Sequence, residues 1–142
     1  MFTFAAHTKL FMKIAIDFDG TIVEHAYPAI GKEIPFAFST LKMLQQQGHL
    51  LILWTFRSGD LLQEAVDFCQ KKGITFYVVN ASYPEEVYDP AASSRKIDAD
   101  IFIDDRNIGG FPGWGEIYQM LHPDDKNGVR IKKKKNFFSF IK

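Results

Sequence analysis

The sequence predicts an α/β fold in which a central, mainly parallel sheet lies between layers of helices. Three observations lead to this prediction: the apolar segments are short, they alternate with helical patterns, and 142 residues is the size of one domain. A chain of this length buries a sufficient core, whereas two ordinary domains would need more residues. Alternating strands and helices form βαβ units with right-handed crossovers, which predicts a three-layer, doubly wound arrangement.

Four short apolar segments are predicted to be strands, at residues 13–18, 50–55, 75–80 and 100–103. They are mostly apolar on both sides of the period-two alternation. This is typical of strands that are covered on both faces.

Two segments have the pattern of amphipathic helices. Residues 35–47 begin with a proline and are followed by Gly48, and the apolar face is formed by Phe36, Thr40, Leu41 and Leu44. Residues 60–72 are followed by Gly73, with Ser58 or Asp60 as the predicted N-cap. The inward positions predicted for this second helix are Leu61, Leu62, Ala65, Val66, Phe68 and Cys69.

Ligands of doubly wound sheets bind beyond the carboxyl ends of the strands. Polar residues at or just after the ends of the predicted strands are therefore the candidates for a site. They are Asp17, Asp19, Thr55, Asn80, Asp104 and Asp105.

The composition is that of a globular protein without a charge bias. Lysine plus arginine and aspartate plus glutamate number 17 each, which gives no general case for nucleic-acid or membrane binding. The one cysteine, Cys69, can form neither an internal disulfide nor a cysteine-based metal site. A cytoplasmic protein is expected, because residues 1–11 lack a basic leader and no stretch reaches about 18 apolar residues.

The two ends of the chain stand outside the α/β pattern. We expect an N-terminal extension at residues 1–11, one folded domain at 12–123 and a basic tail at 124–142. The tail contains four consecutive lysines, Lys132 to Lys135, followed by several phenylalanines. Its simpler interpretation is a solvated tail, and the alternative is an anchor for an anionic partner.

Two carboxylates, Asp17 and Asp19, follow a predicted buried strand and precede Gly20 and Thr21. A carboxylate can attack phosphorus to give an aspartyl-phosphate, and a second one nearby can protonate the leaving oxygen and then activate water. The alternative is a turn in which aspartates bind nearby amides. The preceding strand and the following Gly-Thr favour the catalytic interpretation, with Asp17 as nucleophile and Asp19 as general acid and base.

Three further positions fit phosphoryl chemistry. Thr55 and the amides after it could hold a phosphoryl oxygen. Asp104 and Asp17, with the carbonyl of Asp19, could hold Mg²⁺, which prefers oxygen ligands. Lys96 could offset the negative charge, although Arg95 beside it is the alternative. Each position also has a simpler interpretation when taken alone. Thr55 would be an ordinary strand threonine, Asp104-Asp105 the start of a solvated loop and Lys96 a surface lysine.

In these motifs the sequence resembles the haloacid dehalogenase (HAD) superfamily of phosphohydrolases. Its four motifs match Asp17 to Thr21, Thr55, Lys96 and the pair Asp104-Asp105. The resemblance covers about residues 12–121. It implies a Rossmann-like, HAD-like fold, an Asp17 nucleophile, an Asp19 acid/base, and Mg²⁺ held by Asp17, the Asp19 carbonyl and Asp104.

Many members of this superfamily carry an inserted cap domain that selects the substrate. Residues 21–35 and 72–96 are too short for one, so the chain resembles the capless members, whose site is open unless a partner subunit or a flap closes it. The nearest substitutes for a cap in this sequence are Arg57, His25, Asn80 and Tyr83. Arg57, Asn80 and Asp105 are expected to support the site or the substrate.

The expected function is that of a Mg²⁺-dependent phosphatase acting on a phosphorylated small molecule. Two alternatives stay open: a binding or regulatory module with the same fold, and a phosphatase for nucleic-acid ends that uses the lysine tail. A homo-oligomer that covers the open site is a possible partner arrangement.

Overall fold

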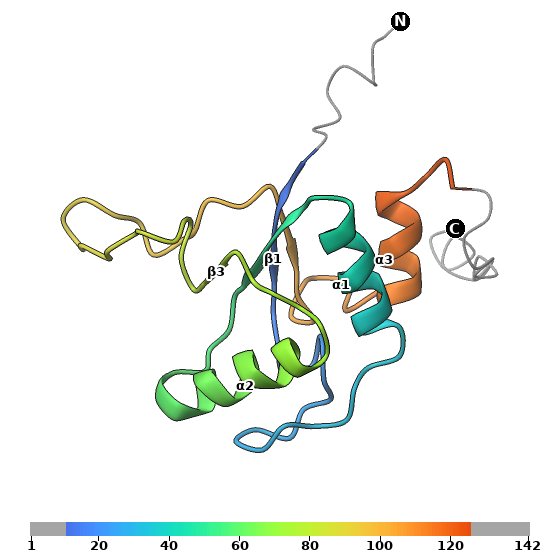
Figure 1. Cartoon of the computed structure of the whole chain (residues 1–142), viewed down its shortest axis with the longest axis horizontal. Coiled ribbons are helices and arrows are strands. Elements are labelled where there is room, and N and C mark those ends of the chain that lie inside the picture. Colours follow the sequence, from blue (N-terminus) through green and yellow to red (C-terminus); the bar gives the residue numbers. More distant parts are fainter. Residues whose placement is uncertain (1–10, 126–142) are drawn as a thin grey trace, which may run out of the picture. The chain divides into compact units, whose positions relative to one another are not determined.

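The computed structural model describes residues 11–125 and contains two compact units, which divide between Phe111 and Pro112. The first unit is an α/β unit (Figure 1). Its strands are β1 (Lys13–Ile16), β2 (Leu50–Leu53), β3 (Val78–Val79) and β4 (Ile101–Ile103). Its helices are α1 (Ala37–Gln46) and α2 (Gly59–Lys71).

All four strands are parallel, in the order β3-β2-β1-β4. In the register of the sheet, Ile16 at the end of β1 lies opposite Leu53 of β2 and Ile103 of β4. The three strands therefore end at the same level. This confirms the predicted α/β class and parallel sheet, and it is consistent with a Rossmann-like fold.

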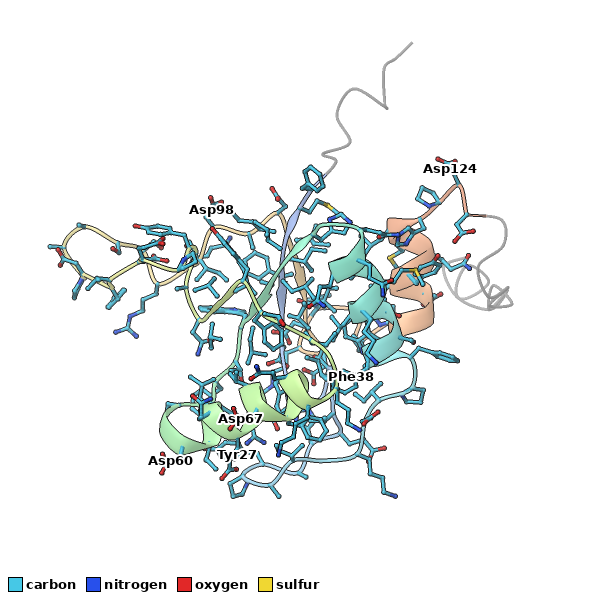
Figure 2. The ribbon with its side chains drawn as sticks, viewed as in Figure 1. Tyr27, Phe38, Asp60, Asp67, Asp98 and Asp124 are labelled. Carbon is cyan, nitrogen blue, oxygen red and sulfur yellow. The ribbon has the colours of Figure 1, made fainter. Side chains whose placement is uncertain are left out.

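The core of this unit is built on the two central strands. Ile14, Ala15 and Ile16 of β1 are at most 1% exposed, as are the last three residues of β2. Burial therefore does not alternate along either strand, as expected of strands covered on both faces. Phe68 of α2 lies edge-to-face against Phe38 of α1, with 5.9 Å between the ring centroids. Side chains of the two helices therefore contact each other, and Phe38 is labelled in Figure 2.

The predicted strands are longer than the observed ones. The segment at 13–18 leaves the ladder after Ile16, the one at 50–55 after Leu53, and the one at 75–80 contributes only Val78 and Val79. At the first two, the chain turns away where the polar site residues begin. The pattern of apolar residues could not show this, because Phe18 and Trp54 beyond the strand ends are themselves apolar.

The predicted helices are confirmed with small corrections. The first begins at Ala37, because Phe36 takes a left-handed conformation with φ of 67°. Phe36 is 59% exposed and does not belong to the buried face. The second helix begins at Gly59 after Ser58, whose side chain makes no capping hydrogen bond. Ala65 and Cys69 are its fully buried positions.

The described part of the second unit, residues 112–125, contains a helix that the sequence pattern did not predict, α3 (Trp114–Leu121). Trp114 and Ile117 are its buried residues. The expected domain at 12–123 thus spans both units. The expected extension at 1–11, apart from Phe11, and the lysine tail from residue 126 onward lie outside the described residues. Within residues 11–125, no helix has both the length and the apolarity that a membrane span requires.

Candidate active site

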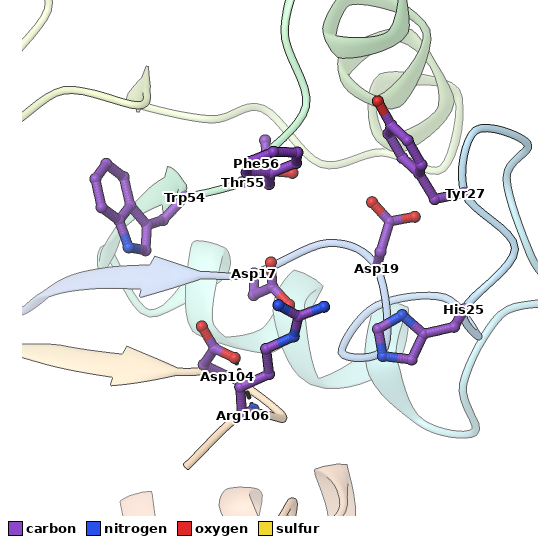
Figure 3. Close-up of a pocket in the computed structure, with 9 residues that line it drawn as sticks. All are labelled: Asp17, Asp19, His25, Tyr27, Trp54, Thr55, Phe56, Asp104 and Arg106. Atoms are coloured by element: carbon purple, nitrogen blue, oxygen red, sulfur yellow. Dashed lines mark hydrogen bonds between the residues drawn. The ribbon is translucent and has the colours of Figure 1, made fainter.

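A pocket of about 590 Å³ lies where the strands of the first unit end (Figure 3). Its lining residues follow β1, β2 and β4 or come from the loop after β1: Asp17, Asp19, His25, Tyr27, Trp54, Thr55, Phe56, Asp104 and Arg106. The sheet register brings them together. The amide of Asp17 donates to the carbonyl of Ile103 at 3.0 Å, and that of Trp54 to the carbonyl of Ile16 at 2.8 Å. Of the predicted site residues, Asp17, Asp19, Thr55 and Asp104 line this pocket, as does His25, which was expected as a substitute for a cap.

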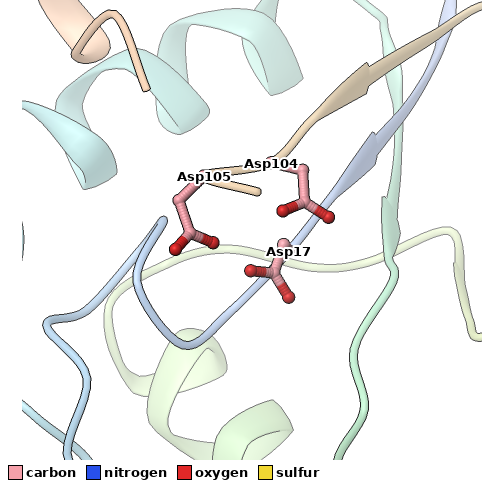
Figure 4. Close-up of side chains that lie close together, drawn as sticks. All are labelled: Asp17, Asp104 and Asp105. Atoms are coloured by element: carbon pink, nitrogen blue, oxygen red, sulfur yellow. The ribbon is translucent and has the colours of Figure 1, made fainter. Parts of the chain in front are cut away.

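Three carboxylates meet at the base of the site (Figure 4). One oxygen from each of Asp17, Asp104 and Asp105 lies within 4.8 Å of the other two. The pKa of Asp17 is raised to about 7, first by burial, then by the hydrogen bond with Asp105 and by the charge of Asp104. Concentrated negative charge of this kind is relieved by a proton or by a cation. Clustered carboxylate oxygens are also the donors that Mg²⁺ and Ca²⁺ prefer.

Thr21 and His25 hold Asp105 in this cluster. The hydroxyl of Thr21 lies 3.2 Å from oxygens of both Asp17 and Asp105, and it accepts the amide hydrogen of Asp105 at 3.1 Å. His25 Nε2 lies 2.8 Å from Asp105 Oδ2. Burial acts to raise the pKa of Asp105, but its hydrogen bonds with His25, with Asp17 and with a backbone amide, together with the electrostatic attraction to His25, lower it on balance. Asp105 is therefore fixed by its neighbours within the described chain.

Gly20 is required where it stands. It has φ of +87°, and a Cβ at this position would lie 2.2 Å from His25 Nε2 and 2.4 Å from Asp105 Oδ2. A side chain at this position would therefore clash with both His25 and Asp105 and would break the hydrogen bond between them.

Asp19 is held by Arg57 rather than by the acidic cluster. Arg57 donates from Nε to Oδ2 at 2.8 Å and from Nη2 to Oδ1 at 2.7 Å, a bidentate geometry. The same guanidinium donates to the carbonyls of Pro28 and Ala29 at 3.1 and 2.8 Å. Arg57 is 1% exposed, and its hydrogen bond with Asp19 raises its pKa further. Arg57 therefore supports Asp19 from behind the pocket.

Asn80 supports the loop after β2. Its side-chain oxygen accepts the amide hydrogen of Thr55 at 2.8 Å, and the Thr55 hydroxyl accepts the amide hydrogen of Arg57 at 3.2 Å. Asn80 itself has φ of 51°. Thr55 reaches the pocket, and Asn80 fixes the backbone that carries it.

Lys96 lies outside the pocket that Thr55 and Asp104 line. Lys96 is exposed and does not belong to the lining of the pocket, and its amide donates to Ser94 Oγ at 3.1 Å. Arg95 is also outside the lining, with its Nε 3.2 Å from the hydroxyl of Tyr88. Tyr83, expected as a substitute for a cap, is exposed outside the lining as well.

Sequence reasoning missed four of the lining residues: Tyr27, Trp54, Phe56 and Arg106. Arg106 directly follows the acidic pair, which was a usable signal. Trp54 and Phe56 flank Thr55, but their apolar character is equally typical of a buried strand. No local pattern marks Tyr27.

Without a divalent cation, we expect the thermal stability of the protein to fall as the pH rises from about 4 to about 7. The pKa of Asp17 is raised from 3.8 to about 7 by folding, so between these values the folded chain binds more protons here than the unfolded chain. Stability then decreases with rising pH. The melting temperatures of the wild type and of Asp17→Asn, which lacks the titrating carboxyl, are measured in EDTA at several pH values. The same dependence of the melting temperature on pH in both proteins would contradict the prediction.

The chain is similar to one solved structure. It is that of a conserved protein from Bacteroides thetaiotaomicron, with 59% sequence identity and a TM-score of 0.74, and the match covers 79% of this chain and 90% of that one. No family model matches the chain, and no curated protein does. At this identity and coverage, the chain belongs to the same family as the conserved Bacteroides thetaiotaomicron protein.

Proposed function

We propose that the protein is a Mg²⁺-dependent phosphatase that hydrolyses a phosphomonoester through an aspartyl-phosphate on Asp17, as a capless member of the HAD superfamily. The observation that carries this proposal is the pairing of Asp17 and Asp19 in one pocket. Asp17 lies in a carboxylate cluster, whereas Asp19 is held separately by Arg57. Two carboxylates in such different surroundings suit two different roles.

The absence of an inserted domain in the described chain supports the capless assignment. Between β1 and α1, residues 17–36 form turns and the isolated bridges Asp19–Val23 and Val23–Glu33. Between α2 and β4, within the described residues, the only regular element is β3. Neither connection is long enough to fold as a cap.

The donor set fits a hard divalent cation, because three carboxylates converge and the pKa of Asp17 is raised by their proximity as well as by burial. Asp17 and Asp104 would hold Mg²⁺, together with the Asp19 carbonyl that the superfamily resemblance implies. Asp105 would steady Asp17 through the network with Thr21. A bound Mg²⁺ would supply charge neutralisation at the phosphoryl oxygens.

The protein's own residues perform the proton and nucleophile steps of the proposed reaction. An Asp17 oxygen forms a bond to phosphorus as the ester oxygen leaves, and that oxygen takes a proton from Asp19. In the second half, Asp19 takes a proton from water, whose oxygen bonds to phosphorus and displaces Asp17. Thr55 would hold a phosphoryl oxygen through its hydroxyl. Arg57 would stabilise the Asp19 carboxylate that forms when Asp19 gives up its proton, and this ionised form is the one that takes a proton from water.

We expect release of inorganic phosphate from small phosphomonoesters to require Mg²⁺. A panel of phosphorylated metabolites, assayed with Mg²⁺, with EDTA and with Mg²⁺ restored in excess over EDTA, tests this. Phosphate release that survives EDTA would remove the metal from the proposal. If a broad panel gave no release, the protein would be better described as a binding module.

Replacing Arg106 with methionine should lower kcat/KM by about 10²-fold, which is the usual cost of losing one preorganised electrostatic partner. Arg106 lines the pocket with Asp17 and Asp104, whereas the resemblance gives this role to Lys96, which does not line it. Steady-state kinetics of Arg106→Met and Lys96→Met compare the two. A larger loss in Lys96→Met would return the role to Lys96.

A further inference from the structure

We propose that the pocket accepts a phosphomonoester whose leaving group carries a planar aromatic ring, with a nucleoside monophosphate as the matching substrate class. This inference rests on the proposed function, because it concerns the substrate of the same site. It goes beyond that function because the charged residues of the proposed mechanism act on the phosphoryl group and do not determine which leaving group the pocket accepts.

The pocket is larger than a phosphoryl group requires. Its volume of about 590 Å³ falls in the range of about 300–1,000 Å³ that is typical of clefts for small organic ligands. The groups suited to phosphate and metal use only part of this space. The rest can hold a leaving group with a ring system.

Three aromatic side chains line that remaining space: Tyr27, Trp54 and Phe56. In Figure 3 they lie on one side of Asp17, and Asp104 and Arg106 lie on the other. Phe56 is 93% exposed and Tyr27 is 52% exposed, so both rings leave apolar surface in water. A flat ring that covers them would gain both apolar burial and stacking.

Two of these rings are held in place. Trp54 packs against the buried residues Ala15, Ile52 and Ile97. The ring of Tyr27 lies against the guanidinium of Arg57, with 5.3 Å between the guanidinium carbon and the ring centroid. Rings that are already ordered lose little conformational entropy when a ligand stacks on them.

The charges of the pocket favour a neutral ring. Asp17, Asp19 and Asp104 all line it, and they would repel a leaving group that carried a further carboxylate. A nucleobase is flat and uncharged at neutral pH, and a ribose separates it from the phosphate. This matches a site in which the aromatic rings and the acidic residues lie side by side.

The test compares adenosine 5′-monophosphate with ribose 5-phosphate, because the two esters share the same phosphorylated sugar carbon and differ in the base. We expect wild-type kcat/KM to be about 5- to 150-fold higher for the nucleotide, from the usual effect of stacking one base. In Phe56→Ala this preference should shrink, because turnover of the nucleotide falls more than turnover of ribose 5-phosphate does. Phe56→Tyr, which keeps the ring, should retain the preference.

Tyr88→Ala is the matched control, because Tyr88 is an exposed aromatic residue outside the pocket, and it should leave both activities unchanged. Equal kcat/KM for the two esters in wild type, or a preference that Phe56→Ala does not alter, would overturn the inference and leave the phosphatase function intact. Failure of both esters, together with a broad panel that gives no phosphate, would overturn the proposed function and this inference with it.

Discussion

Replacing Asp17 with asparagine is expected to lower phosphate release by at least about 10³-fold, the scale of loss that follows removal of a nucleophile. An amide in this position cannot form the aspartyl-phosphate bond. Asp17→Ala should be equally inactive, and it removes the possibility that slow deamidation restores the acid. Release of phosphate under single-turnover conditions measures the effect.

The fold should survive this substitution, because burial and the charge of Asp104 disfavour the ionised Asp17 without a cation. Its raised pKa reflects burial and the proximity of Asp105 and Asp104. The melting temperature of Asp17→Asn in EDTA at pH 7.5 should therefore equal or exceed that of wild type. Asp60→Asn, at an exposed carboxylate in the first turn of α2, is the matched control and should keep full activity. Activity of Asp17→Asn within tenfold of wild type would exclude Asp17 as the nucleophile.

The positions of the acidic residues could be predicted because they follow from the sheet. In a parallel sheet, neighbouring strands deliver their next residues to one edge. β1, β2 and β4 end in register, so Asp17, Thr55 and Asp104 meet in one pocket. Only the recognition of short apolar segments was needed for this, and small errors in the strand ends did not affect it.

The partners of these residues could not be predicted in the same way. Arg57 belongs to the loop after β2, and its four side-chain hydrogen bonds depend on where a separate loop places Asp19 and the carbonyls of Pro28 and Ala29. From the sequence, Arg57 was expected both as a substitute for a cap and as a support for the site or the substrate, but the partner of this side chain could not be named. In the structure Arg57 is buried and holds Asp19.

Apolar residues near the strand ends posed the opposite difficulty. Trp54 and Phe56 are residue types common in strands, and the apolar pattern predicted a strand that continues to residue 55. The ladder ends at Leu53, so Trp54 lies beyond it and lines the pocket, as Phe56 does. The helix α3 was missed for a simpler reason, since the spacing of Trp114, Ile117 and Leu121 carries a helical signal over only eight residues.

The buried pair of Arg57 and Asp19 has a consequence for stability as well as for orientation. The Arg57 side chain is fully buried, and that of Asp19 is 15% exposed. Removing the Arg57 guanidinium leaves the largely desolvated Asp19 carboxylate without its partner. It also leaves the carbonyls of Pro28 and Ala29 without their hydrogen-bond donor. Losses of this kind belong to the small group of substitutions with large effects.

Arg57→Met is therefore expected to lower the free energy of unfolding by about 3–5 kcal/mol, which corresponds to a fall in Tm of about 10 °C or more for a domain of this size. Arg106→Met serves as the matched control, because it removes an exposed arginine from the same pocket and should change stability by no more than about 0.5 kcal/mol. The double variant Arg57→Met with Asp19→Asn should be less destabilised than the two single variants summed, since no unpaired carboxylate remains. Urea unfolding of the wild type and of the four variants, three single and one double, measures these differences. A loss at Arg57 no larger than that at Arg106, or strict additivity in the double variant, would show that the bidentate pair does not hold Asp19 in solution.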